Sequence, residues 1–291
     1  MKEQLHPILQ NLTDNSGKLT AKSRIIADQV IKYPRKVIFM TTKELSKACN
    51  VSEATVVRFV SQLGYATYSE FKQSLRDYVD TELTLLDRID IAELGVPGAE
   101  RLRRVIYKEI DNLKQLYETL DTKALSRLID LLQNSEEVYV IGSRLSYTFA
   151  YYMGWSLSKL RKNIHTLKGS DTTALDRLAM ASPDSLVVII ATSRYTNELI
   201  KIGKFAARLK CTLVTITDSA TCPLNQFSHE TLTAPSRYIP YIGSLSAISC
   251  LINYISLELT SRMAERIQTH QKNLEQSYLE NDLFFNVKTP L

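Results

Sequence analysis

Residues 41–64, TTKELSKACNVSEATVVRFVSQLG, constrain the fold of this chain most tightly, because two sets of helix-capping signals fall close together. Thr41 with Glu44 three residues later has the spacing of a capping box, and Ser52 is a second N-cap candidate. Gly64 follows the second of these helices. Because glycine adopts a left-handed backbone at little cost, it predicts the end of that helix. The sequence therefore predicts two short helices joined by a turn at residues 49–51.

The second predicted helix has an apolar side and a polar side. Its apolar residues recur at helical spacing and predict a buried side: Val56, Phe59, Val60 and Leu63. Four polar residues are expected to face outward: Ser52, Glu53, Thr55 and Arg58. Short polar groups followed by an arginine are what a recognition helix presents to DNA base edges and phosphates. An ordinary helical hairpin with a solvated polar side is the alternative interpretation.

Positive charge is concentrated around this helix pair. Residues 1–79 carry 12 Lys and Arg against 7 Asp and Glu, whereas the remaining residues hold 24 of each sign. Such a local excess attracts the phosphates of DNA through counterion release. The predicted DNA-binding residues are Lys43, Lys47, Ser52, Glu53, Thr55, Arg58 and Lys72, and Arg76 is a further basic candidate.

Further helices are predicted on both sides of the pair, over residues 20–32 and 67–79. The first should bury Ile25, Ile26, Ala27, Val30 and Ile31. The order LTAKSRIIADQVIKYP, VSEATVVRFVSQLGY and EFK resembles the N-terminal DNA-binding domain of the RpiR family of bacterial regulators. This resemblance implies an all-α helix-turn-helix domain over residues 1–79.

Several protein classes have no support in the sequence. The sequence contains no apolar run of about 18 residues, the length needed to span a bilayer, and the first 15 residues lack the apolar stretch of a signal peptide. The four cysteines have no CxxC spacing, and the four histidines form no HxxH or HExxH pattern. We therefore expect a cytoplasmic protein with reduced thiols, no metal site and no cofactor.

Residues 80–121 predict a linker followed by a packing helix. Gly95-Val96-Pro97-Gly98 should break any helix, and beyond it apolar residues recur at three- and four-residue spacing from Leu102 to Leu120. The apolar stripe could cover the neighbouring domain or contact a second copy of the chain. We expect this helix and the last long helix, over residues 244–264, to form a homodimer.

From Asp121 onward the pattern alternates between helices and strands. Apolar runs predict strands at residues 138–141 and 186–191, and the alternation with helices places further strands at residues 163–167, 212–217 and 230–233. Regular alternation with short connections implies a doubly wound parallel sheet, whose ligands are expected at the carboxyl edge. The predicted fold class is thus α/β over residues 122–264 behind an all-α domain, with residues 265–291 as a C-terminal tail.

Hydroxyl residues come directly after two of these strands. Ser143-Arg144-Leu145-Ser146 follows the first strand and Ser193-Arg194-Tyr195-Thr196 follows the middle one. Hydroxyls and backbone N–H groups at the start of a helix can hold an anion. Each segment alone also fits an ordinary pair of helix caps. Two such segments at neighbouring strand ends favour a pocket.

Residues 125–262 resemble a SIS domain, the sugar isomerase fold that binds phosphosugars, in GSRLSYTFA, IATSRYTNE and TITDSATCPL. The resemblance implies that the sugar phosphate is held by Ser143, Ser146, Ser193 and Thr196. Many members have Ser-Gly-x-Thr where this chain has Ser193-Arg194-Tyr195-Thr196. Arg194, with Arg144, could therefore strengthen binding of an acidic ligand or fill the phosphate pocket. Ser244 could add a hydroxyl to the same cavity or cap the last helix.

Together these patterns predict a transcriptional regulator without catalytic residues. Its helix-turn-helix domain would bind operator DNA, palindromic for a dimer, and its sensor domain would bind a small anionic metabolite of the phosphosugar type. A phosphosugar isomerase-like enzyme is the alternative, with Glu198 and His229 as the candidate base pair. A structural protein that uses both hydroxyl segments only as caps is a third hypothesis.

Overall fold

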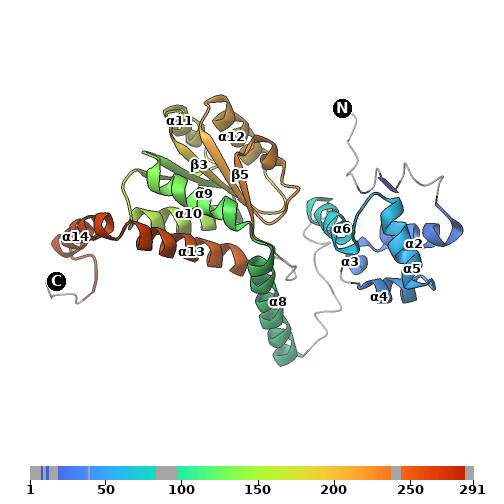
Figure 1. Ribbon diagram of the computed structural model, residues 1–291. Coiled ribbons are helices and arrows are strands. Elements are labelled where there is room, and N and C mark those ends of the chain that lie inside the picture. Colours follow the sequence, from blue (N-terminus) through green and yellow to red (C-terminus); the bar gives the residue numbers. More distant parts are fainter. Residues whose placement is uncertain are drawn as a thin grey trace. The chain divides into compact units, whose positions relative to one another are not determined.

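The computed structural model describes residues 8, 11–12, 19–38, 40–82, 97–236 and 244–285. The chain divides into two compact units, Met1–Arg88 and Ile89–Leu291 (Figure 1). The predicted linker region is therefore divided between them, since its first residues continue the last helix of the N-terminal unit and its packing helix belongs to the C-terminal unit.

The N-terminal unit is all-α in its described part, as predicted. Its helices are α2 (Ala21–Lys32), α3 (Pro34–Val37), α4 (Thr42–Ala48), α5 (Glu53–Gln62) and α6 (Tyr68–Glu82). Thr41 and Glu44 form the predicted capping box at α4, and the Ser52 hydroxyl caps α5 by accepting from Thr55 N at 3.3 Å. Gly64 has a φ of +87°, which confirms the left-handed residue after α5.

The core of this unit joins α2, α5 and α6. Phe59 and Phe71 are fully buried and meet edge to face, with ring centroids 6.0 Å apart. The prediction that α2 buries Ile25 and Ile31 is wrong, since these side chains are 49% and 55% exposed. The buried stripe follows the helical period through Ser23, whose hydroxyl donates to Gln62 Oε1 at 3.1 Å.

The C-terminal unit is built on a five-stranded parallel sheet. Its strands are β1 (Val138–Gly142), β2 (Ile164–Lys168), β3 (Leu186–Ala191), β4 (Thr212–Thr217) and β5 (Glu230–Thr233), in the order β2-β1-β3-β4-β5. Its helical elements are α8 (Gly98–Thr119), α9 (Thr122–Asn134), α10 (Leu145–Ser158), α11 (Thr173–Ala179), α12 (Asn197–Arg208), η3 (Pro223–Phe227), α13 (Ser246–Arg262) and α14 (Ala264–Glu280). The predicted doubly wound α/β fold is confirmed.

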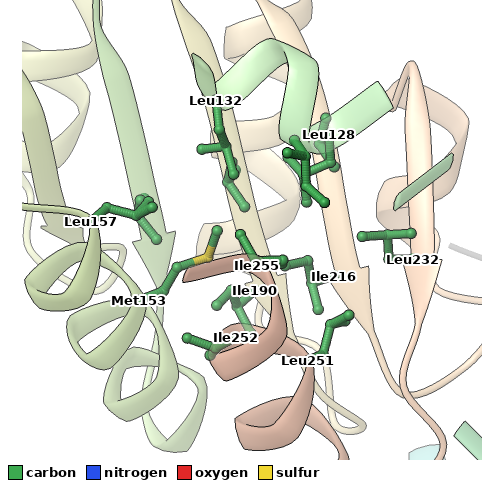
Figure 2. Close-up of a cluster of buried hydrophobic side chains, with 14 of the residues drawn as sticks. Leu128, Leu132, Met153, Leu157, Ile190, Ile216, Leu232, Leu251, Ile252 and Ile255 are labelled. Atoms are coloured by element: carbon green, nitrogen blue, oxygen red, sulfur yellow. The ribbon is translucent and has the colours of Figure 1, made fainter. Parts of the chain in front are cut away.

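Helices cover both faces of the sheet (Figure 1). Alternate strand residues such as Val188 and Ile190 pack against α9, α10 and α13, and Figure 2 shows the centre of this cluster, where Ile190 and Ile216 lie close to Ile252 and Ile255. The intervening strand residues, among them Ile189, pack against α11 and α12. Burial on both faces explains why β3 is apolar throughout.

Two helices of the C-terminal unit correspond to the predicted tail and the predicted packing helix. Most of the predicted tail forms α14, which contributes the buried Ile267 to the core shared with α13. The apolar stripe of α8 is largely exposed, with Leu102 and Ile106 accessible and Leu116 buried. Among the described residues, no helix has both the length and the apolar character needed to cross a bilayer.

Candidate functional site

The predicted DNA-binding side of α5 is exposed apart from one residue. Ser52, Glu53 and Arg58 are exposed, and Arg58 Nε donates to Ala54 O at 3.3 Å. Thr55 is only 8% exposed, and its hydroxyl lies 2.8 Å from Ser52 Oγ. The prediction that Thr55 faces outward is wrong, because its side chain turns back onto the N-cap residue three positions earlier.

The basic residues around α5 differ in exposure and in the contacts that they make. Lys43 and Lys47 are exposed on α4. Lys72 is half-buried, since its Nζ donates to Met40 O at 3.3 Å and lies 5.7 Å from the centroid of the Tyr68 ring. Lys72 therefore helps to join α6 to the segment before α4. The side chain of Arg76 lies outside the described residues.

In the C-terminal unit the two hydroxyl segments lie side by side, because β1 and β3 are neighbours in the sheet. Ser146 Oγ is buried, lies 3.0 Å from Thr192 Oγ1 and accepts from Thr192 N at 3.1 Å. The turn after β1 is tight, since a Cβ on Gly142 would lie 2.4 Å from Ser146 O. The predicted meeting of the two strand ends is confirmed.

Both segments lead into helices whose N-termini lie at this edge. At α10 the N-cap residue, Arg144, makes no side-chain capping hydrogen bond within the part of the chain that the structure describes. At α12 the hydroxyl of Thr196 accepts from Leu199 N at 3.5 Å, so this residue acts as an ordinary cap. The first turn of α10 thus keeps its backbone N–H groups free of side-chain caps.

Asp218, directly after β4, holds Ser193 in place. Its carboxylate accepts from Ser193 N at 2.9 and 3.0 Å, from Ser193 Oγ at 2.5 Å and from Tyr195 Oη at 3.1 Å. Desolvation raises the pKa of Asp218, and the hydrogen bonds from Ser193 and Tyr195 oppose that shift in part. The sequence interpretation missed this residue, although it comes directly after a predicted strand and therefore belongs to the same edge.

Ser143 differs from the other hydroxyl residues of the edge. It is 3% exposed, and its hydroxyl oxygen has no hydrogen-bond partner in the part of the chain that the structure describes. Leaving a buried hydroxyl unpaired costs about 1–3 kcal/mol. The protein therefore leaves unused bonding capacity at the end of β1.

Arg144 and Arg194 adopt backbone conformations that favour glycine. Their φ angles are +52° and +67°, and Arg144 has a ψ of −126°. Both side chains are exposed, so neither is buried within the site. Over residues 97–236 and 244–285, neither guanidinium makes a hydrogen bond or an ion pair with another described residue.

Ser244 is buried, and its hydroxyl bonds to another side chain instead of capping α13. Its hydroxyl donates to Glu109 Oε2 of α8 at 2.5 Å, and the hydroxyl of Ser246 donates to the same oxygen. The N-cap position of α13 is Leu245, which makes no side-chain cap. The prediction of a plain cap at Ser244 is wrong, because the carboxylate of Glu109 attracts both serine hydroxyls.

The candidate base pair of the isomerase hypothesis is not assembled. His229 lies just before β5, and its Nδ1 accepts from Leu213 N at 3.0 Å near the amino end of β4. Glu198 lies in the first turn of α12, which comes after the carboxyl end of β3. The two residues therefore belong to opposite edges of the sheet. No group of three or more metal-ligating side chains occurs among the described residues.

Two family models match the chain, one for each unit. A model of the helix-turn-helix domain of the rpiR family matches residues 6–82, and a model of the SIS domain matches residues 131–260. The transcriptional regulator HexR of Pseudomonas aeruginosa is 22% identical over 276 residues, which cover 93% of this chain and 95% of HexR.

Solved structures show the same fold. The NanR protein of Vibrio vulnificus, complexed with ManNAc-6P, has a TM-score of 0.56 and 22% identity over 94% of this chain and 98% of NanR. The sugar isomerase domain of an RpiR transcription factor from Sphaerobacter thermophilus has a TM-score of 0.57 and 21% identity, covering 60% of this chain and 97% of that domain.

Proposed function

The chain belongs to the RpiR family of helix-turn-helix transcriptional regulators that carry a SIS domain, and from this premise we propose that a phosphosugar bound at the β1–β3 edge controls its binding to operator DNA. The observation that carries the ligand part is the buried, unpartnered hydroxyl of Ser143 beside the uncapped N-terminus of α10. The phosphosugar in the NanR structure supports the choice of ligand.

Helix α5 is the proposed recognition helix. Ser52, Glu53 and Arg58 would contact base edges or phosphates in the major groove, and Lys43 and Lys47 of α4 would contact the backbone. Thr55 is left out of this surface because it is buried. Lys72 is left out because its Nζ donates to Met40 O.

The DNA part is tested with Arg58→Ala and a matched control, Arg24→Ala, which removes an exposed arginine of α2. A duplex selected by the protein from a random library is compared with an unselected duplex by fluorescence anisotropy over a range of salt concentrations. Loss of a guanine contact should weaken binding to the selected duplex by about 1–3 kcal/mol. Equal weakening on both duplexes would assign Arg58 to a phosphate, and unchanged binding would remove α5 from the interface.

In the sensor unit, Ser143, Ser146 and Ser193 would hold the phosphate together with the first N–H groups of α10. A thermal-shift screen of hexose and pentose phosphates against their unphosphorylated sugars tests this. Only phosphorylated compounds are expected to bind the folded chain, and only a ligand that binds the folded state raises the unfolding temperature. Ser193→Ala should reduce the shift, whereas Ser126→Ala, at an exposed position on α9, should not.

A homodimer is the proposed assembly, and its operator is proposed to be palindromic. The exposed apolar residues of α8, among them Leu102, Ile106 and Ile110, support an interface there. Sedimentation of Ile106→Glu should show a monomer where the unsubstituted chain shows a dimer.

The protein would act in the bacterial cytoplasm, where operator DNA lies. It would bind its sugar without turnover, because the candidate base pair is not assembled.

A further inference from the structure

The site carries the same four-residue pattern twice. Ser143-Arg144-Leu145-Ser146 follows β1 and Ser193-Arg194-Tyr195-Thr196 follows β3, so both read Ser-Arg-x-Ser/Thr. In each copy the arginine has a positive φ, of +52° and +67°. The two copies are joined by the hydrogen bonds between Ser146 and Thr192. The two arginines therefore flank one shared edge.

Arginine is a costly choice at such positions. A positive φ in a non-glycine residue carries strain, and residues strained in this way cluster at functional sites. Glycine would adopt both conformations without this cost. The strained backbone at Arg144 and Arg194 thus indicates that the guanidinium groups themselves have a role at the edge.

The charges of Arg144 and Arg194 have no partner among the residues that the structure describes. Both guanidiniums are exposed and lack a carboxylate or hydrogen-bond acceptor among the residues described in this unit. Asp218, the acidic residue beneath Ser193, already accepts hydrogen bonds from Ser193 and Tyr195. Two unpaired like charges beside one site repel each other, and binding of an anion between them relieves that repulsion.

One phosphate does not need these arginines. The hydroxyl of Ser143 and the N–H groups at the start of α10 already offer donors for a single phosphoryl group. A guanidinium is a planar fork that binds carboxylates and phosphates through two parallel hydrogen bonds. The guanidinium groups of Arg144 and Arg194 are therefore available to bind a second acidic group on the ligand.

We propose that this site selects phosphosugars that carry a second acidic group, a carboxylate or a second phosphate, over phosphosugars with a single phosphate. The proposal rests on the proposed function, since it assumes that the first phosphate occupies the serine edge. Arg144 and Arg194 are the residues that determine this specificity.

The test uses three open-chain ligands that differ at one end: glucitol 6-phosphate, gluconate 6-phosphate and glucitol 1,6-bisphosphate. Isothermal titration of the full chain should show the two ligands with a second acidic group binding about tenfold more tightly or better, as one or two charge-assisted hydrogen bonds would give. Arg144→Gln and Arg194→Gln should each reduce this ratio at least severalfold while leaving the affinity for glucitol 6-phosphate nearly unchanged. Lys201→Gln, at an exposed position on α12, should leave all three affinities unchanged.

A second pair of variants separates charge from backbone strain. Arg144→Gly and Arg194→Gly remove the same charges and also relieve the positive φ, so each should lose the ligand preference and raise the thermal midpoint of the unliganded chain by about 2–4 °C. Equal affinities for the three ligands in the unsubstituted chain, or an unchanged ratio in both glutamine variants, would overturn the proposal and leave the phosphosugar function standing. If none of the three phosphorylated compounds bound, the proposed function would fail with it.

Discussion

Hydroxyl side chains near helix starts serve different purposes in the two units. In the N-terminal unit Thr20, Thr41 and Ser52 each accept from a backbone amide three residues later, at 3.2–3.3 Å. In the C-terminal unit Ser146 contacts Thr192, 46 positions away, and Ser193 donates to Asp218, 25 positions away. The first group stabilises helices locally, whereas the second builds a surface from separate strands.

The difference shows that the same residue types become caps or site residues according to which neighbours the fold gives them. A serine with three helical residues after it finds its partner in its own turn. A serine at the end of a parallel strand faces the neighbouring strand ends, whose identity depends on strand order. Thr196 shows that a single segment can contain both kinds, because it caps α12 while Ser193 bonds to Asp218.

The largest expected effect separates the two units. Phe59→Ala should lower the free energy of unfolding of the N-terminal unit by about 3–5 kcal/mol, because Phe59 is fully buried and packs edge to face on Phe71. DNA binding should be lost while the phosphosugar-induced thermal shift remains. Val57→Ala, at a half-exposed position of the same helix, is the control. Loss of the ligand response in Phe59→Ala would show that the units do not fold independently.

A smaller loss of stability is expected when the contact between Asp218 and Ser193 is broken. Asp218→Asn should cost about 1–3 kcal/mol, because an amide cannot accept from all of Ser193 N, Ser193 Oγ and Tyr195 Oη. The variant should also lose most of its response to phosphosugars in titration calorimetry, since Ser193 is no longer held. Asp184→Asn, at an exposed position before β3, should behave like the unsubstituted chain.

The same substitution has a pH signature. Desolvation raises the pKa of Asp218 above the ordinary 3.8, so the unfolded chain releases this proton at lower pH than the folded one. The contribution of Asp218 to the free energy of unfolding is complete below that ordinary value and is lost as the pH rises through the folded pKa. Urea unfolding of Asp218→Asn at several pH values should lack this decline, and an identical slope in both proteins would contradict the assignment.

The smallest effect concerns a local cap. Ser52→Ala should destabilise the N-terminal unit by about 1 kcal/mol, because Thr55 N loses its acceptor. Ser52→Asp keeps an acceptor at the N-cap and should preserve stability, yet its negative charge should weaken DNA binding if Ser52 lies beside phosphate. Thermal unfolding and anisotropy on both variants separate the two roles. Full DNA affinity in Ser52→Asp would place Ser52 away from the DNA.

Much of the secondary structure was predictable because its signals are local. The capping box at Thr41, the cap at Ser52 and the left-handed Gly64 depend on residues a few positions apart, and all three are confirmed. Strands β1 and β3 were recognisable as apolar runs, and both are buried along their whole length. The orientation of α2 was less accessible, since Ile25 and Ser23 lie on a helix whose buried side is chosen by its neighbours.

The candidate site was predictable in part. The sequence indicated that Ser143, Ser146 and Ser193 lie at one edge, because parallel strands end on the same side of a sheet. It did not indicate that Asp218 holds Ser193 or that Glu109 binds Ser244, since each contact joins residues from different elements. The DNA-binding and ligand-binding roles of all these site residues stay predictions.

The amino-acid sequence by itself determined which segments become helices and strands, and which unit carries the positive charge, because capping, apolar periodicity and charge depend on near neighbours along the chain. Tertiary structure alone decided that Asp218 holds Ser193 and that the hydroxyl of Ser143 has no partner among the described residues. The physical reason is that a side chain's partner is fixed by which strand lies next to it, and strand order is a property of the folded sheet.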